Sequence, residues 1–493
     1  MIASPTTASR SDARYPWVVM AIVLCGTYLV VLDTTVLGVA LATIADDLHA
    51  AESVGIDWVI TSYLIAVGIV QPASAWLADR FGRKQVYMGA LLAFTLASLL
   101  AGIAPNLELL IGARLLQGLG GGLMMPVGMT MVWDQFPPHR RGMAMGIHGV
   151  AIMAAPAFGP VFGGYVVTSL SWRLLFLVNL PIGLAAFALA WRLLREDGQR
   201  ADRRLDVRGW LLVSATVLVV VIGTREAGGW GWTSSASLAV AAVAVLLGAA
   251  AIRWLRRVAH PLIELEMFGV PAFRLVTIMN CLMTASMYAR VAFLPTELQV
   301  VRGMTAQRVG FLFMLGALAI AATMPIGGWL ADRIGARGPV FLGQLAVAVS
   351  LWALSNLTPG ASEAELLLIL VGGGLGVGLS VSAPQVVGMN ALPPRLIGQA
   401  STMNSLSRQV AGAISTSVLA AVIVSGVGAV APPDAASRVG EVQAAYNDMF
   451  FVAFLVSLVT VLMALRLPGR LATRALRHPE PVMVDAAEAA SGI

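Results

Sequence analysis

Long apolar segments recur along the whole of this chain, and they constrain its fold more than any other feature. Each has about 20 residues with few charges, which is enough to cross a hydrocarbon layer of about 30 Å as a helix. Inside lipid, backbone polar groups are satisfied only in helices or closed barrels, and continuous rather than alternating apolar runs favour helices. Hydrophobic residues make up 58% of the 493 positions and charged residues only 12%, too few to cover a soluble helical protein. We therefore predict an all-α polytopic membrane protein.

Fourteen spans are predicted, at residues 17–41, 54–78, 85–104, 107–132, 142–168, 172–194, 208–224, 236–255, 274–299, 308–331, 338–357, 364–389, 399–427 and 448–466. Arginine and lysine concentrate in alternate loops, as the positive-inside rule describes, and this bias predicts that both termini are cytoplasmic. The first apolar run is too long for the core of a signal peptide and is expected to be retained. The net charge of +6 therefore reflects membrane topology, and no nucleic-acid partner is expected. The predicted location is the cell membrane.

The chain repeats itself. Trp76–Gly82 returns as Trp329–Gly335, 253 residues later, and Gly142 after a Pro-Pro pair returns as Gly398, 256 residues later. Each repeat holds six spans, and parallel halves of this kind frame a central site with alternating access. The predicted segments are a cytoplasmic tail (1–16), a six-helix bundle (17–200), an inserted helix pair (201–260), a second six-helix bundle (261–468) and a cytoplasmic tail (469–493).

The repeated loop is a candidate conformational latch. Gly82 permits a tight turn, and an acid beside basic residues at helix ends can pair across helices. A solvated loop that only sets topology is the alternative, but topology needs only basic charge, and the acid recurs. The predicted latch residues are Asp79, Arg80, Gly82, Arg83, Asp332, Arg333 and Gly335.

Asp33 is the strongest candidate for a functional residue, because a carboxylate within a span is costly and usually functional. It lies eight residues from the outer end of the first span, about 12 Å deep, and Arg114 lies at a similar depth of about 10 Å in the fourth. The two can pair or share a polar cavity. Burial and a neighbouring cation act in opposite directions on an acid, which suits proton coupling. A permanent structural ion pair is the alternative.

Neither of these charges has a counterpart in the second half. By the repeat, Arg114 aligns with Gly372, and Asp33 falls near Tyr288 to Arg290, where there is no acid in register. The charged residues that suit proton coupling are therefore expected to be concentrated in the first half.

The fifth predicted span carries Gly159, Pro160, Gly163 and Gly164. Gly159 and Gly163 form a small-xxx-small face that allows close helix approach, and the proline favours bending. Ordinary tight packing is the alternative.

Further in-span polar residues are weaker candidates for lining a substrate cavity. Arg290 and Glu297 are seven apart and are predicted to share a helix face. Arg408 lies about ten residues into the thirteenth span, and Gln117 lies one turn beyond Arg114. His148 is more simply read as a packed helix residue.

No phosphate-binding loop, metal-ligand spacing or catalytic set is evident in the sequence. No enzyme activity, metal or cofactor is expected, and a proton gradient would supply the energy.

The motifs resemble those of the major facilitator superfamily. Asp79-Arg80-Phe81-Gly82-Arg83 is similar to its signature loop, although Ala75 replaces the leading glycine that Gly328 keeps, and Arg114-Leu-Leu-Gln117-Gly118 is similar to its proton-related motif. Gly159–Gly164 resembles the antiporter motif. In related exporters this segment is thought to seal the outer half between the domains. Asp33-Thr34-Thr35 and Trp172-Arg173 with Phe176, Asn179 and Gly183 resemble the fourteen-span QacA/EmrB-type drug:proton antiporters.

The resemblance implies a monomeric proton antiporter that exports hydrophobic, cationic or amphipathic drug-like compounds, with Asp33 carrying the proton. Alternatives are a nutrient symporter, an exporter of one endogenous metabolite, lipid or siderophore, and a non-transporting membrane sensor. The antiporter motif disfavours import, and the two latch loops disfavour the sensor.

Overall fold

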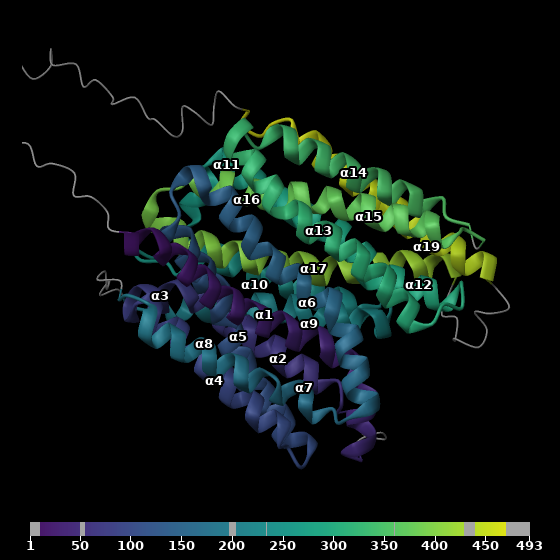
Figure 1. Cartoon of the computed structure of the whole chain (residues 1–493), viewed down its shortest axis with the longest axis horizontal. Coiled ribbons are helices and arrows are strands. Elements are labelled where there is room, and N and C mark those ends of the chain that lie inside the picture. The colour runs from purple at the N-terminus through teal and green to yellow at the C-terminus, as the bar shows by residue number, and fades with distance from the viewer. Residues whose placement is uncertain are drawn as a thin grey trace, which may run out of the picture.

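The computed structural model describes residues 10–49, 55–196, 204–232, 234–358, 360–427 and 439–469, and these form helices joined by short loops. The first half contains α1 (Arg10–Asp47), α2 (Trp58–Val70), α3 (Ser74–Phe81), α4 (Arg83–Gly102), α5 (Leu107–Gln135), α6 (Arg141–Ser169), α7 (Arg173–Leu177) and α8 (Asn179–Leu193). Next come α9 (Val207–Trp230) and α10 (Ser235–Leu255). The second half contains α11 (Pro271–Tyr288), α12 (Leu294–Val300), α13 (Ala306–Ile334), α14 (Arg337–Ser355), α15 (Glu363–Ser380), α16 (Ser382–Asn390), α17 (Ile397–Val427) and α19 (Val439–Ala464). In Figure 1 the purple and blue helices of the first half lie mainly below the green and yellow helices of the second.

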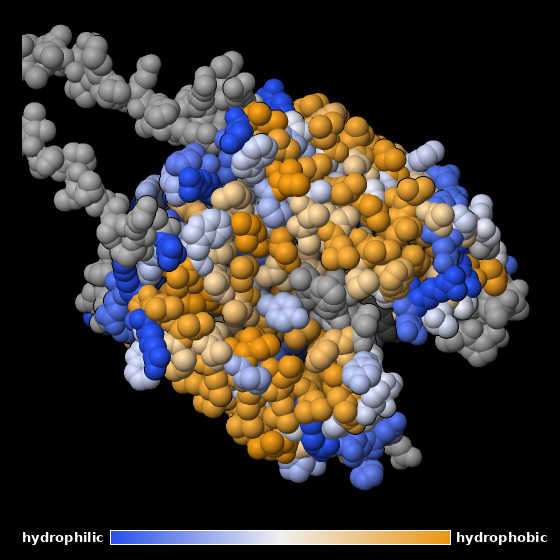
Figure 2. All heavy atoms as spheres, in the orientation of Figure 1, coloured by the Kyte–Doolittle hydropathy of each residue, from blue (hydrophilic) through white to orange (hydrophobic). Residues whose placement is uncertain are grey.

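Thirteen helical segments among the described residues are long and apolar enough to cross a membrane, and they match thirteen of the predicted spans. The remaining predicted span, 142–168, corresponds to α6, which has 29 residues but is not among the thirteen. Figure 2 shows hydrophobic residues across the middle of the molecule and hydrophilic residues towards its two ends. The predicted all-helical polytopic membrane fold is confirmed, whereas a total of fourteen spans stays a prediction.

One end of the molecule carries the two repeated loops, and the other end does not. We call the end with the two repeated loops the latch face and the other end the far face. Arg195 N donates to the Tyr15 hydroxyl (2.8 Å), and Arg337 Nε donates to the Leu467 carbonyl (2.9 Å), so the beginning of α1 and the segment after α19 both lie at the latch face. The predicted tail residues 1–9 and 470–493 and the boundary at 200/201 lie outside the described residues.

The repeat is visible in the backbone of the latch face. Gly82, between α3 and α4, and Gly335, between α13 and α14, both have a φ of +91°. A side chain is strained in that region of backbone conformation, which explains why both copies of the loop have glycine there.

Helix α9 lies between the two halves. At one end the Trp210 indole donates to the Ile69 carbonyl of α2 (2.6 Å), and near the other the Ser417 hydroxyl of α17 donates to the Thr224 carbonyl (2.8 Å). Asp206 caps α9 by accepting from Gly209 N (2.9 Å), and it also accepts from the Trp254 indole of α10 (2.9 Å). The inserted pair is therefore tied to both halves as well as to itself.

Candidate functional site

Asp33 and Arg114 form an ion pair inside the first half. Arg114 Nη1 donates to Asp33 Oδ2, and the side chains of both residues are only 1% exposed. The matching depths of the two residues predicted that they could pair, and the structure brings them together. Because a desolvated charge is costly unless it is paired and hydrogen-bonded, the ion pair stabilises both residues at this position.

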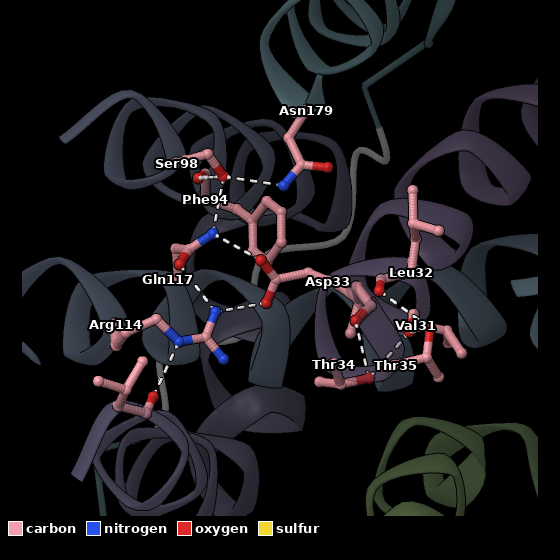
Figure 3. A network of polar contacts seen from close by, with 12 residues as sticks. Val31, Leu32, Asp33, Thr34, Thr35, Phe94, Ser98, Arg114, Gln117 and Asn179 are labelled. Carbon is pink, nitrogen blue, oxygen red and sulfur yellow. Dashed lines mark hydrogen bonds and ion pairs between the residues drawn. The ribbon is translucent and has the colours of Figure 1, made fainter. Parts of the chain in front are cut away.

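Gln117 completes the pair. Its Nε2 donates to Asp33 Oδ1 (3.1 Å) and to the Ser98 hydroxyl (2.7 Å), while its Oε1 accepts from Arg114 Nη1 (2.9 Å). Asn179 Nδ2 of α8 reaches the same hydroxyl at 3.4 Å. Figure 3 shows these side chains converging from α1, α4, α5 and α8. Gln117 is 0% exposed. It therefore belongs to this polar network and does not line open space, which differs from the predicted cavity position.

The remaining contacts of Arg114 come from α2 and α7. Its Nε donates to the Val59 carbonyl (3.0 Å), and its guanidinium carbon lies 4.4 Å from the centre of the Tyr63 ring and 5.9 Å from that of Phe176. A carbonyl and aromatic faces all favour a cation. Arg114 can therefore remain charged and held in place when the charge on Asp33 changes.

Sequence reasoning did not identify Ser98 or Tyr63, and it noted Asn179 only as part of a resemblance. Ser98 has one recoverable signal, because it returns as Ser350 of the second half, 252 residues later. Tyr63 has none, since an aromatic residue in a span is ordinary.

The Trp172-Arg173 segment fixes the far end of α1. The Trp172 indole (3.0 Å) and Arg173 Nη1 (2.7 Å) both donate to Asp47 Oδ2, and these hydrogen bonds hold the pKa of the Asp47 carboxyl below its usual range. Arg173 Nη2 also reaches the Ala104 carbonyl after α4 (3.3 Å). The segment thereby fastens α7 to α1, the helix that carries Asp33.

We expect Gln117→Met to destabilise the protein and to change the pH dependence of its activity. The substitution keeps the length of the side chain but leaves buried partners unsatisfied, at a cost of about 1–3 kcal/mol. Gln344→Met is the matched control, because Gln344 is buried in the second half between Ser380 (2.7 Å) and Thr460 (2.6 Å), away from the ion pair. Both variants should melt at a lower temperature, but only Gln117→Met should alter the pH profile. Equal pH profiles would show that Gln117 is merely structural.

The second latch loop joins the two halves at the latch face. Asp332, at the end of α13, accepts from the backbone N–H groups of Gly142 (3.0 Å) and Met143 (2.9 Å) in the first turn of α6. A carboxylate at a helix N-terminus satisfies free donors and complements the helix dipole. Arg333 does not take part, since its guanidinium stacks 4.3 Å above the ring of Trp329.

The first latch loop makes different contacts. Arg83 forms an ion pair with Asp134 at the end of α5, and Lys84 donates to the Leu194 carbonyl after α8 (2.6 Å). Asp79 lies on the wall of a small polar pocket together with Asp206 at the beginning of α9. Arg80 follows it at the end of α3.

Two glycines of the predicted antiporter segment face α1. A Cβ atom on Gly159 would lie 2.6 Å from Thr35 Oγ1, and one on Gly163 would lie 3.3 Å from Val36 Cβ. Gly164 meets nothing within 4 Å, and the side chain of Pro160 lies outside the described residues. Thr35 and Val36, two and three positions beyond Asp33, therefore pack closely against Gly159 and Gly163 of α6.

The prediction that Arg290 and Glu297 share a helix face is not supported. A π-helical turn over Ala289–Phe293 separates them, and such a turn shifts the register of the helix. Arg290 donates to the Leu370 carbonyl of α15 (3.2 Å), whereas Glu297 pairs with Arg302 (3.3 Å). Both are buried within the second half, at 7% and 0% exposure, so they do not line an open cavity.

Two helical halves that meet at a carboxylate-capped helix, with a buried ion pair inside one of them, fit the arrangement of a membrane transporter. The chain belongs to the Major Facilitator Superfamily, whose family model matches residues 23–416.

Known relatives and solved structures agree with this assignment. The chain is 33% identical over 449 residues to the tetracenomycin C resistance and export protein of Streptomyces glaucescens (89% of this chain, 82% of the relative). It is 32% identical over 398 residues to a multidrug resistance protein B homolog of Mycobacterium tuberculosis (79% and 73%). Among solved structures, a proton:xylose symporter matches with a TM-score of 0.60 at 15% identity (93% of this chain, 97% of that chain), which supports the fold alone.

Proposed function

We propose that this protein is a proton-coupled antiporter that exports amphipathic, drug-like compounds by alternating access, as a monomer with its latch face in the cytoplasm. The observation that supports this most is the sealed ion pair of Asp33 and Arg114. An acid within a span whose partner is held independently is suited to accept and release a proton. The names of two relatives, a tetracenomycin C resistance and export protein and a multidrug resistance protein B homolog, support export.

Protonation of Asp33 is the proposed switch. A neutral carboxyl group no longer attracts the guanidinium, so the connection between α1 and α5 weakens, while Arg114 keeps its bond to the Val59 carbonyl and its contact with Tyr63. Deprotonation restores the connection. The proton therefore changes how firmly α1 is held and does not need to move Arg114.

Helix α6 would carry this change to the interface between the halves. Towards its C-terminal end α6 contacts α1 at Thr35 and Val36, and at its first turn it contacts α13 through Asp332. A shift of α1 is thus transmitted through packed backbone with no flexible linker between the proton site and the latch.

Purified protein in liposomes tests the proposal. A pH gradient should drive uphill movement of a fluorescent drug-like dye, and collapsing the gradient with an ionophore should stop it. Proton flux in the opposite direction should appear only when the dye is present. Dye movement that ignores the gradient would contradict the proposed coupling.

Export of one endogenous metabolite is the second candidate, and the similarity to a protein named for export of a single compound favours it. A panel of chemically unrelated dyes separates the two, because a dedicated exporter should move few of them.

A further inference from the structure

The middle of α17 carries a cation that the proposed proton site does not use. Arg408 lies eleven residues from the beginning of α17, about 17 Å along the helix, and is half-buried. That depth is close to the middle of a hydrocarbon layer of about 30 Å. A guanidinium facing lipid at such a depth is costly, so it should face the interior of the protein.

Among the described residues, no carboxylate forms an ion pair with Arg408. The sequences of α6, α11 and α17 contain no aspartate or glutamate. Asp33, in α1, is already paired with Arg114. Arg408 is therefore an uncompensated positive charge.

Arg408 is placed where the two halves meet. Helix α17 packs against α11 of its own half and against α5 of the other half, and Tyr288 of α11 and His148 of α6 both lie within electrostatic range of Arg408. The Tyr288 ring packs beside Gly412, one turn from Arg408, where a Cβ atom would lie 3.0 Å from the hydroxyl oxygen. His148 is itself buried and bonded to Thr27 (3.1 Å). Tyr288 is 37% exposed although it lies within a span, so its side chain is not fully enclosed by other side chains.

A second donor lies on the same face of α17. Asn404 is one turn before Arg408 and only 7% exposed. Its Oδ1 accepts from Asn280 of α11 (3.1 Å), whereas its Nδ2 is buried with no described partner. A buried donor without an acceptor costs about 1–3 kcal/mol, and a ligand that brings an acceptor would recover that cost.

We propose that Arg408, Asn404 and Tyr288 bind the acidic group of the exported compound, an apolar body that bears a carboxylate or phenolate. The inference rests on the proposed export function and names its substrate class. The site offers a cation and N–H donors, and charge-assisted bonds from a guanidinium to an oxyanion are strong and geometrically specific. It opposes the expectation of cationic substrates, because a cation would be repelled by Arg408 with no nearby carboxylate to offset the repulsion.

Two probes with one body and opposite charge test the proposal: 1-pyrenebutyrate and 1-pyrenebutylamine. Binding is measured by fluorescence on the purified full chain without a pH gradient, so that a failure of proton coupling cannot affect the result. The wild type should bind the carboxylate more tightly. Arg408→Gln should weaken that binding by about tenfold or more, equivalent to about 1.4 kcal/mol, and leave the amine unchanged or improved. Arg408→Lys should retain most of the preference.

Arg274→Gln is the matched control, because it removes an exposed arginine of α11 and should leave both probes unaffected. If Arg408→Gln does not fold, Arg408→Lys and Tyr288→Phe are compared with the wild type in the same assay. A wild type that prefers the amine, or an Arg408 variant that loses both probes equally, would overturn the proposal. Asp33→Asn with intact binding but no gradient-driven transport would separate this site from the proton site.

Discussion

Asp33→Asn is expected to reduce pH-gradient-driven transport to the level of empty liposomes. Asparagine has nearly the same shape and can still accept from Gln117, but it cannot take up or release a proton. Transport in proteoliposomes with an imposed gradient measures the loss. Glu108→Gln, on an acid in the first turn of α5, is the matched control and should transport normally.

Folding must be separated from coupling in this experiment. Removing one partner of a buried ion pair leaves an uncompensated charge, at a cost of about 3–5 kcal/mol. The double variant Asp33→Asn/Arg114→Gln removes both charges and should recover thermal stability without recovering transport. Gradient-driven transport by either variant would rule out Asp33 as the proton carrier.

The sequence was sufficient to predict the spans and the depth of this site. Thirteen spans coincide with helices of the structure, because length and hydropathy alone decide which segments can cross a membrane. Depth follows from the residue count along a helix, and so the pairing of Asp33 with Arg114 could be anticipated.

The side of a helix on which a residue lies was harder to predict than its depth along the helix. Ser98 and Tyr63 join the site because of the way α4 and α2 rotate against α5, and no count along the chain gives that rotation. The π-helical turn at Ala289–Phe293 changes the faces on which Arg290 and Glu297 lie, and regular helical spacing does not reveal it.

The second half helps to explain the asymmetry of the molecule. Arg290 lies close to the repeat equivalent of Asp33, and its guanidinium occupies the space beside Gly373, where a Cβ atom would lie 2.4 Å from Nη1. Gly373 follows Gly372, which is the repeat equivalent of Arg114. The second half thus has one buried cation where the first has an ion pair, and it has no acid at the position equivalent to Asp33.

The same comparison explains the unusual Ala75 of the first latch loop. Its equivalent is Gly328, and the two residues meet equivalent glycines of the opposite half. A Cβ atom on Gly398 would lie 3.7 Å from Ala75 Cβ, an ordinary contact, so alanine fits there. A Cβ atom on Gly328 would lie 2.0 Å from the Gly142 carbonyl oxygen, so alanine does not fit. The contact between α6 and α13 is therefore tighter than the equivalent contact between α3 and α17.

We expect Gly328→Ala to abolish transport by preventing closure of the latch face. The added methyl group would meet the backbone of α6, which cannot move away as a flexible side chain can, so α6 and α13 must separate. Separation also pulls Asp332 away from the Gly142 and Met143 N–H groups. Spin labels at His139 and Gly338, which are exposed on opposite halves, should report a longer distance than in the wild type.

Gly398→Ala supplies the matched control, because the same substitution at the equivalent position meets only a contact of 3.7 Å. It should leave the label distance and transport close to the wild type. Gly142→Ala should reproduce the effect of Gly328→Ala, since its Cβ atom would lie 2.4 Å from the Gly328 carbonyl oxygen. If the alanine variants at 142 and 328 transport normally, the latch face does not need this contact, and closure must depend on Asp332 and the first latch loop instead.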